Sequence, residues 1–293
     1  MLTFNFHSPE EELKAPLFQE KDIQVFIKRD DMIHPYISGN KWRKLKYSLQ
    51  EAQSTGKSTL VTFGGAWSNH LLATAAAAAK FGFKSYGFVR GEAVDNAVLS
   101  LCKIFGMQLI FVDRTAYKDK ELLFDRQFGR DNQAFFIDEG GFGPLAAKGV
   151  SELMDELENN YQHIFCACGT GTTLAGLLQG LTSNSTTQIH GIPVLKAGSF
   201  IYEEVKALGI DPEGVILHTE YHFGGYAKTK PELIDFVKEF SQNTGILIEP
   251  TYTGKLFYGV YDLIKQDYFK PKSKILLIHS GGLTGLLGML DKF

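Results

Sequence analysis

The sequence predicts an α/β protein whose mainly parallel open sheets are flanked by helices. Eight short β-rich runs alternate with segments of helical periodicity, and Gly-rich turns follow several of these runs. The chain has 293 residues, which is enough for two domains at the usual ~100–200 residues each. Hydrophobic residues make up 44% of the chain and charged residues 22%, and this composition excludes a disordered or fibrous protein.

The expected strands are short and lie at residues 59–63, 85–89, 108–112, 134–137, 163–168, 188–194, 215–218 and 274–279. Apolar residues recur at i, i+3, i+4 and i+7 in four segments, which predicts helices over 98–105, 150–157, 233–240 and 257–264. Parallel strands joined by helices need right-handed crossovers, and open sheets of this kind bind ligands beyond the carboxyl ends of their strands. We therefore expect functional residues directly after strands.

Charge and hydropathy narrow the class of protein. Lys and Arg number 30 and Asp and Glu number 33, so the formal charge of −3 gives no global attraction to nucleic acid or to an anionic membrane. No apolar run approaches the ~20 residues of a membrane span, and residues 1–18 do not have the pattern of a secretory signal. Three cysteines cannot form a disulfide framework and suit a reducing cytosol. The sequence predicts a cytoplasmic enzyme that acts on a small molecule.

A first candidate site lies at Lys41, in the segment Ser38-Gly39-Asn40-Lys41. Asn40 is a good N-cap, so Lys41 is expected in the first turn of a helix, where the positive end of the dipole disfavours an ammonium. The nearby cations Arg43, Lys44 and Lys46 act in the same direction. A lysine held in this way can be a neutral amine nucleophile of the kind that forms Schiff bases. The alternative is a basic, solvated helix face, which this segment by itself favours.

A second candidate is the turn 63–70, which closes an expected strand and opens an Ala-rich helix. Its two glycines allow close approach of a ligand, and Ser68 or Asn69 can cap a helix whose free N–H groups bind an anion. A substrate carboxylate or a phosphate would suit this turn. A well-capped strand-to-helix turn without a ligand is equally compatible with it.

The third candidate is a Gly/Thr loop at 169–176, between a strand and an apolar helix, as in a phosphate cradle. It is not a dinucleotide fingerprint, because the third glycine falls at 176 instead of 174. No Walker A loop is present either, so a monophosphate is the better guest. Cys166 and Cys168 have no His or Cys partners at zinc spacing and are expected to pack in the core. The segment 218–222 is not HExxH, and we expect no metal site.

In this order, the segments resemble the D-cysteine desulfhydrase / 1-aminocyclopropane-1-carboxylate (ACC) deaminase group. These are pyridoxal-phosphate (PLP) enzymes with the tryptophan synthase β-like fold, called fold type II. The match runs from Lys28-Arg29-Asp30-Asp31 to His279-Ser280-Gly281-Gly282 and so covers nearly the whole chain. It is carried by the blocks KRDD, GNKxRKL, GGxxSNH, GTGTTLAG and PTYTGK.

The resemblance implies a role for each matched position. Lys41 would carry PLP, and Ser68, Asn69 and His70 would meet the substrate carboxylate and the phenolic side of the cofactor. The implied phosphate loop consists of Gly169, Thr170, Gly171, Thr172 and Thr173. Lys41, Ser68 and two active-site tyrosines, Tyr226 and Tyr252, would be catalytic, and Thr253 would face the pyridine nitrogen.

The resemblance also implies two domains, each with a mainly parallel open sheet. We expect a larger cofactor-binding domain from residues 1–47 and 151–293, and a smaller domain from residues 48–150. A small amino acid is the expected substrate, the expected assembly is a homodimer, and no nucleic-acid or membrane partner is expected. Three departures from the family pattern concern the substrate: Ser38 replaces a Gly, Ala227 with 228–230 replaces a Gly followed by an apolar residue and Pro, and the chain is shorter than typical members.

Thr253 favours one reaction within the group. A carboxylate would keep the pyridine nitrogen protonated, whereas a hydroxyl is a neutral partner and leaves a weaker electron sink. The resemblance implies Glu at this position in ACC deaminases, because opening a cyclopropane needs a stronger sink. We therefore expect D-cysteine desulfhydrase-like β-elimination to a keto acid and ammonia. The alternatives are an ACC deaminase, a racemase or dehydratase of another small amino acid, and a non-catalytic protein that binds PLP or an amino acid.

Overall fold

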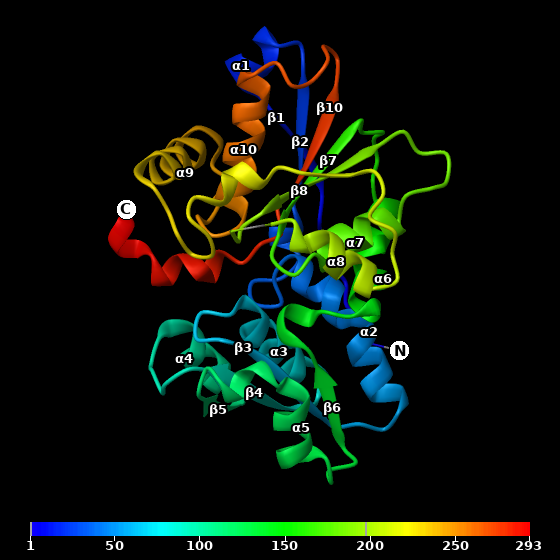
Figure 1. The fold of residues 1–293 in the computed structure, drawn as a ribbon, viewed down its shortest axis with the longest axis vertical. Helices are drawn as coiled ribbons and strands as arrows, with labels where there is room; N and C mark the ends of the chain where they lie inside the picture. The colour runs from blue at the N-terminus through cyan, green and yellow to red at the C-terminus, as the bar shows by residue number, and fades with distance from the viewer. Residues whose placement is uncertain (1, 197) are drawn as a thin grey trace.

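The computed structural model describes residues 2–196 and 198–293, and it arranges the strands in two separate sheets (Figure 1). The larger sheet has six strands in the order β1-β2-β10-β7-β8-β9, and the smaller has four in the order β5-β4-β3-β6. Every pair of neighbouring strands is parallel except β1 and β2, which are antiparallel. The α/β class with mainly parallel open sheets is thereby confirmed.

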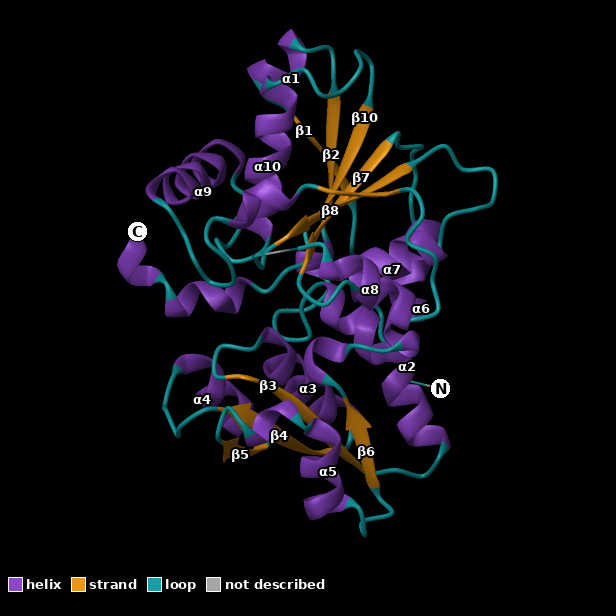
Figure 2. Cartoon of the chain, in the orientation of Figure 1, coloured by secondary structure: helices purple, strands orange, loops and turns teal. Residues whose placement is uncertain are grey.

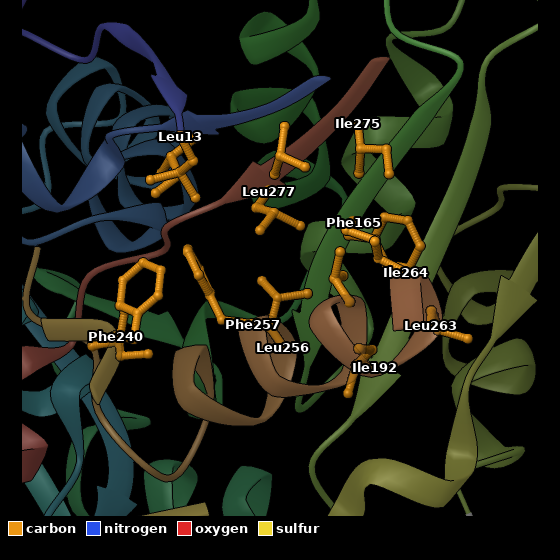
Figure 3. Close-up of a cluster of buried hydrophobic side chains, with 14 of the residues drawn as sticks. Leu13, Phe165, Ile192, Phe240, Leu256, Phe257, Leu263, Ile264, Ile275 and Leu277 are labelled. Atoms are coloured by element: carbon orange, nitrogen blue, oxygen red, sulfur yellow. The ribbon is translucent and has the colours of Figure 1, made fainter. Parts of the chain in front are cut away.

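The six-stranded sheet separates two hydrophobic cores. Its strands are β1 (Glu10–Leu13), β2 (Gln24–Lys28), β7 (His163–Cys168), β8 (Gln188–Pro193), β9 (Val215–Leu217) and β10 (Lys274–Ile278). Helices α1 (Pro16–Glu20), α9 (Pro231–Thr244) and α10 (Thr253–Lys265) cover one face, and α6 (Pro144–Asp155), α7 (Thr172–Gln179) and α8 (Phe200–Ala207) cover the other. Successive strand residues point to opposite faces. Phe165 therefore packs on α10, as Figure 3 shows, whereas Cys166 packs towards α7.

The four-stranded sheet is covered on both faces as well. Its strands are β3 (Thr59–Gly65), β4 (Lys84–Arg90), β5 (Gln108–Val112) and β6 (Ala134–Ile137). Buried side chains of α2 (Asn40–Ser54), α3 (Asn69–Phe81) and α4 (Ala97–Ile104) pack on one face, and Phe128 of α5 (Lys120–Phe128) packs on the other. Figure 2 shows α2 and α6 between the two sheets. Among the helices of the described residues, none combines the length and apolar character of a membrane span.

All eight expected strands are present, with ends within two residues of those predicted, and the four expected helices are α4, α6, α9 and α10. Strands β1 and β2 were not predicted from the sequence. The first is a polar edge strand, Glu-Glu-Glu-Leu, and carries no strand periodicity. The division into residues 1–47 with 151–293 and residues 48–150 stays a prediction; α6, which spans the boundary at 150/151, packs in a core of the six-stranded sheet.

Candidate active site

Lys41 lies in the first turn of α2, as expected, but Asn40 is not the N-cap of that helix. The helix begins at Asn40, and its N-cap is Gly39 with φ +60° and no side-chain cap. Gly39 is required because a methyl group there would lie 1.7 Å from the carbonyl oxygen of Ser280, directly after β10. The side chain of Asn40 instead donates a hydrogen bond to Thr173 Oγ1 at 3.1 Å. The start of α2 thus contacts the segment after β10 and the first turn of α7.

The amine of Lys41 is held in a state that favours the neutral form. Its Nζ donates to the carbonyl oxygen of Gly140 at 3.4 Å. Burial, followed by repulsion from Lys44, lowers the pKa of Lys41 well below its usual value. The expected contribution from Arg43 and Lys46 is wrong, because both pair with carboxylates. A solvated basic face is also excluded, since Arg43 is 2% exposed and Lys44 5%.

In the turn after β3, the side chains of Ser68, Asn69 and His70 have three different environments. Ser68 is the N-cap of α3, and its Oγ accepts the N–H of Leu71 at 3.3 Å. Asn69 lines a cleft, where its Oδ1 accepts the hydroxyl of Thr284 at 2.9 Å. The ring of His70 is buried and turned inward, with Nδ1 about 3.6 Å from the place where a methyl group on Gly141 would lie.

The loop from Gly169 to Thr173 has free backbone donors. Gly171, with φ +72°, is the N-cap of α7 and gives no side-chain cap to it. Among the described residues, the backbone N–H groups of 169–173 find no acceptor outside the helix. The hydroxyl groups of Thr170 and Thr172 lie 3.0 Å apart on the same loop. An uncapped helix start with unpaired N–H groups and a glycine at positive φ can cradle an anion.

Cys166 and Cys168 lie under this loop as free, buried thiols with their sulfur atoms 3.9 Å apart. Their expected role in core packing is confirmed, since both belong to the core between the sheet and α7.

A cleft of about 200 Å³ opens beside these segments. It is lined by side chains from both sheet regions and from the C-terminal segment: Trp67, Asn69, Tyr226, Ala227, Glu249, Thr251, Tyr252, Gly285, Gly288, Met289 and Lys292. The rings of Tyr226 and Tyr252 meet edge to face, with centroids 5.9 Å apart. Tyr226 is 45% exposed at the mouth, whereas Tyr252 lies deeper, where burial raises its pKa well above the usual value. Both phenols are therefore protonated at neutral pH.

Comparison with known proteins identifies the family. The sequence profile described as "Pyridoxal-phosphate dependent enzyme" matches residues 9–281. The chain belongs to this family. A Pyrococcus horikoshii protein provisionally named a 1-aminocyclopropane-1-carboxylate deaminase is 33% identical, over 94% of this chain and 89% of the relative. An Arabidopsis thaliana protein named "Bifunctional D-cysteine desulfhydrase/1-aminocyclopropane-1-carboxylate deaminase, mitochondrial" is 29% identical, over 92% and 75%.

Solved structures agree with this assignment. A crystal structure titled as that of an ACC deaminase homologue has a TM-score of 0.87 and 30% identity, covering 99% of this chain and 93% of the other. A fungal L-serine ammonia-lyase from Rhizomucor miehei has a TM-score of 0.72 at 20% identity, covering 97% and 96%, and shows the shared fold alone. The resemblance to the D-cysteine desulfhydrase / ACC deaminase group is confirmed, and the protein is a PLP-dependent enzyme of this group.

The residues of this pyridoxal-phosphate enzyme fit its cofactor. A phosphate needs N–H donors and a cation, and the loop from Gly169 to Thr173 has the donors. Lys44 is a buried lysine whose Cβ lies about 3.2 Å from the place where a methyl group on Gly141 would lie, and burial lowers its pKa to about 8. An amine with a lowered pKa, Lys41, completes the donor set.

One residue that lines the site was not predicted. Glu249 is 1% exposed and lines the cleft, although the matched block PTYTGK begins one residue after it. Its signal in the sequence is an acidic residue four positions before Thr253, at the start of a helix. Thr253 is fully buried behind the cleft wall, where its Oγ1 accepts the N–H of Glu249 at 2.9 Å.

Proposed function

We propose that this enzyme is a lyase that eliminates a β-substituent from a small amino acid, with D-cysteine as the favoured substrate and sulfide, keto acid and ammonia as products. The observation that carries this proposal is the hydroxyl of Thr253 at the start of α10. Its oxygen accepts the N–H of Glu249 at 2.9 Å, and its hydrogen can be donated to the carbonyl oxygen or to Oε1 of Glu249, each at a long 3.4 Å, so the group carries no charge. A neutral donor at this position favours an unprotonated pyridine nitrogen and elimination over reactions that need a strong electron sink.

PLP, when bound, withdraws electrons from the α-carbon of the amino acid. The protein orients the substrate and supplies the protons. Lys41 would hold the cofactor and, once released, remove the α-proton, because its lowered pKa provides a neutral amine. The N–H groups of 169–173 would bind the phosphate at the start of α7. Ser68, Asn69 and the backbone of His70 lie at the start of α3, where N–H groups can meet a substrate carboxylate.

The two tyrosines would protonate the leaving group. Tyr252 and Tyr226 line the cleft and are protonated at neutral pH, so either phenol can donate a proton to a departing thiolate. The cleft holds about 200 Å³, which favours a small substrate over a bulky one.

A substrate panel tests the proposal. We would measure keto acid and sulfide released from D-cysteine, L-cysteine, β-chloro-D-alanine, D-serine and ACC by the holoenzyme. Turnover of D-cysteine with little turnover of ACC supports the proposal. Efficient ACC opening with D-cysteine untouched contradicts it and supports ACC deaminase, the second candidate, which the names of the relatives favour. A spectral response to amino acids without any product would point to a binding protein.

A further inference from the structure

The helix that presents Tyr252 and Thr253 is capped in an unusual way. A helix normally takes its cap from a Ser, Thr, Asp or Asn at the N-cap position. In α10 the N-cap residue is Tyr252, whose side chain makes no cap hydrogen bond. The cap comes instead from Glu249, three residues earlier, whose side chain reaches forward over the turn. The N-cap position is thereby left to a phenol that lines the cleft.

Glu249 holds three successive backbone N–H groups. Its Oε2 accepts the N–H of Thr251 at 2.7 Å, and its Oε1 accepts those of Tyr252 at 2.7 Å and Thr253 at 2.8 Å. Its own N–H donates to Thr253 Oγ1 at 2.9 Å. These four bonds fix the backbone under the phenol and the orientation of the hydroxyl, the two groups on which the proposed function depends.

The carboxylate of Glu249 is buried and makes no ion pair within the described parts of the chain. Burial raises its pKa to about 7, against the opposing effect of the three N–H donors. A buried charge is retained at such a cost only where its hydrogen bonds are satisfied. A simple cap could be an exposed Ser or Asp, so stability alone does not account for a carboxylate in the cleft wall.

We propose that Glu249 is a positioning residue, which sets Tyr252 and Thr253 against the bound cofactor and substrate through their backbone. The inference rests on the proposed lyase function for its kinetic readout. It predicts that loss of the second carboxylate oxygen disturbs catalysis more than it disturbs folding. In Glu249→Gln, the amide oxygen can still accept the N–H groups of Tyr252 and Thr253. The amide NH2, however, faces the N–H of Thr251, and two donors cannot form a hydrogen bond.

A matched control exists at Glu10, which does not line the cleft. Its carboxylate likewise accepts a backbone N–H, that of Glu158 at 2.7 Å, together with the side chains of Asn159 and Tyr161. Glu10→Gln and Glu249→Gln would be compared for melting temperature, PLP content, absorption spectrum of the bound cofactor, kcat and KM. For Glu249→Gln we expect full PLP content, a shifted cofactor spectrum, kcat lower by about tenfold or more, and KM changed by less than about threefold. Glu249→Asp, which keeps the charge, should lie between this variant and the wild type.

The inference is overturned if Glu249→Gln behaves like Glu10→Gln, with a lower melting temperature but an unchanged spectrum and kcat. If Glu249→Gln does not fold, Glu249→Asp decides on the same readouts: a shifted spectrum and lowered kcat in a folded protein support the role, and wild-type values contradict it. The spectrum needs only the bound cofactor. An enzyme inactive on D-cysteine and ACC would therefore contradict the substrate proposal while the spectral comparison still decides the role of Glu249.

Discussion

Nε2 of His70 lies 2.8 Å from Oγ1 of Thr62, and this contact determines which ring nitrogen of His70 carries the proton. The single hydroxyl hydrogen of Thr62 goes to the carbonyl oxygen of Ile137 at 2.8 Å, so Thr62 accepts from His70 and Nε2 is protonated. Nδ1 is then a buried lone pair without a partner among the described residues. Burial, followed by repulsion from Lys41 and Lys44, lowers the pKa of His70 well below its usual value and keeps the ring neutral.

Removing the acceptor at Thr62 should destabilise the protein. In Thr62→Val the Nε2–H of His70 is buried without a partner, and we expect a loss of about 1–3 kcal/mol in the free energy of unfolding. Thr74→Val is the control, because Thr74 is equally buried and its hydroxyl has no partner in the described structure. Urea denaturation of both variants measures the difference. Equal losses would contradict the tautomer assigned to His70.

Lys41 should be the lysine that binds the cofactor covalently. Borohydride reduction of the holoenzyme followed by peptide mapping is expected to place the pyridoxyl group on Lys41. Lys41→Ala should lose the label, while Lys46→Ala, five residues further on in the same helix and paired with Glu152, should keep it. A label on another lysine would refute the assignment.

The glycine at the start of α7 should matter for cofactor retention. Gly171→Val and Gly82→Val both place a β-branched residue at positive φ, +72° and +81°, so each costs about 1–2 kcal/mol of stability. Only Gly171 lies in the proposed phosphate loop, so its substitution should in addition weaken PLP binding. Fluorescence titration of the two apoproteins with PLP gives the dissociation constants. Similar constants would exclude the loop as the phosphate site.

Tyr252→Phe should lower kcat by about tenfold or more while PLP stays bound, since the phenol is a proposed proton donor. Tyr258→Phe, on the same helix but outside the cleft, is the matched control and should retain wild-type kcat. The measurement is steady-state release of keto acid together with PLP content by absorbance. Release of PLP by Tyr252→Phe, with normal chemistry in the molecules that keep it, would assign the residue a structural role.

Acid should destabilise the fold through the hydrogen-bonded histidines of β7, β8 and the residue after β9. His190 lies between His163 and His218 with nitrogen separations of 3.0 Å, and burial lowers its pKa to about 2. Below pH 6.5 His190 binds a proton in the unfolded chain but not in the folded protein. Its contribution to the free energy of unfolding is therefore complete above pH 6.5 and is lost as the pH falls. The loss is about 1.4 kcal/mol per pH unit for each such histidine. Urea denaturation between pH 8 and 5 should show a smaller loss for His190→Phe than for the wild type or for exposed His7→Phe; equal losses would contradict the assignment.

Much of the fold was predictable because the central strands β3, β7 and β10 are buried on two faces. Such strands are continuous apolar runs, as in residues 164–168 and 275–278, and they are visible without any tertiary information. Strand β1 was not visible, because an edge strand has one partner and can be polar: its pairing with β2 is decided by register and by Leu13 in the core. The start of α2 was also not predictable from local sequence. Side-chain preference indicates Asn40 as the N-cap, but the close approach of the carbonyl oxygen of Ser280 requires glycine at position 39, which is the N-cap in the structure.

The sequence by itself determined the fold class, the order of the motifs and their place directly after strands, because these depend on periodicity and on backbone chemistry that neighbouring residues set. Only the tertiary structure decided which groups are charged, paired or free. Arg43 and Lys46 look like cations acting on Lys41, yet Arg43 pairs with Asp30 and with Glu156, 113 residues away, and Lys46 pairs with Glu152, 106 residues away. Glu249 lies outside the matched sequence blocks, and its environment is defined by burial and by three N–H donors. Electrostatics depends on distance and burial in space, and neither is a local property of the chain.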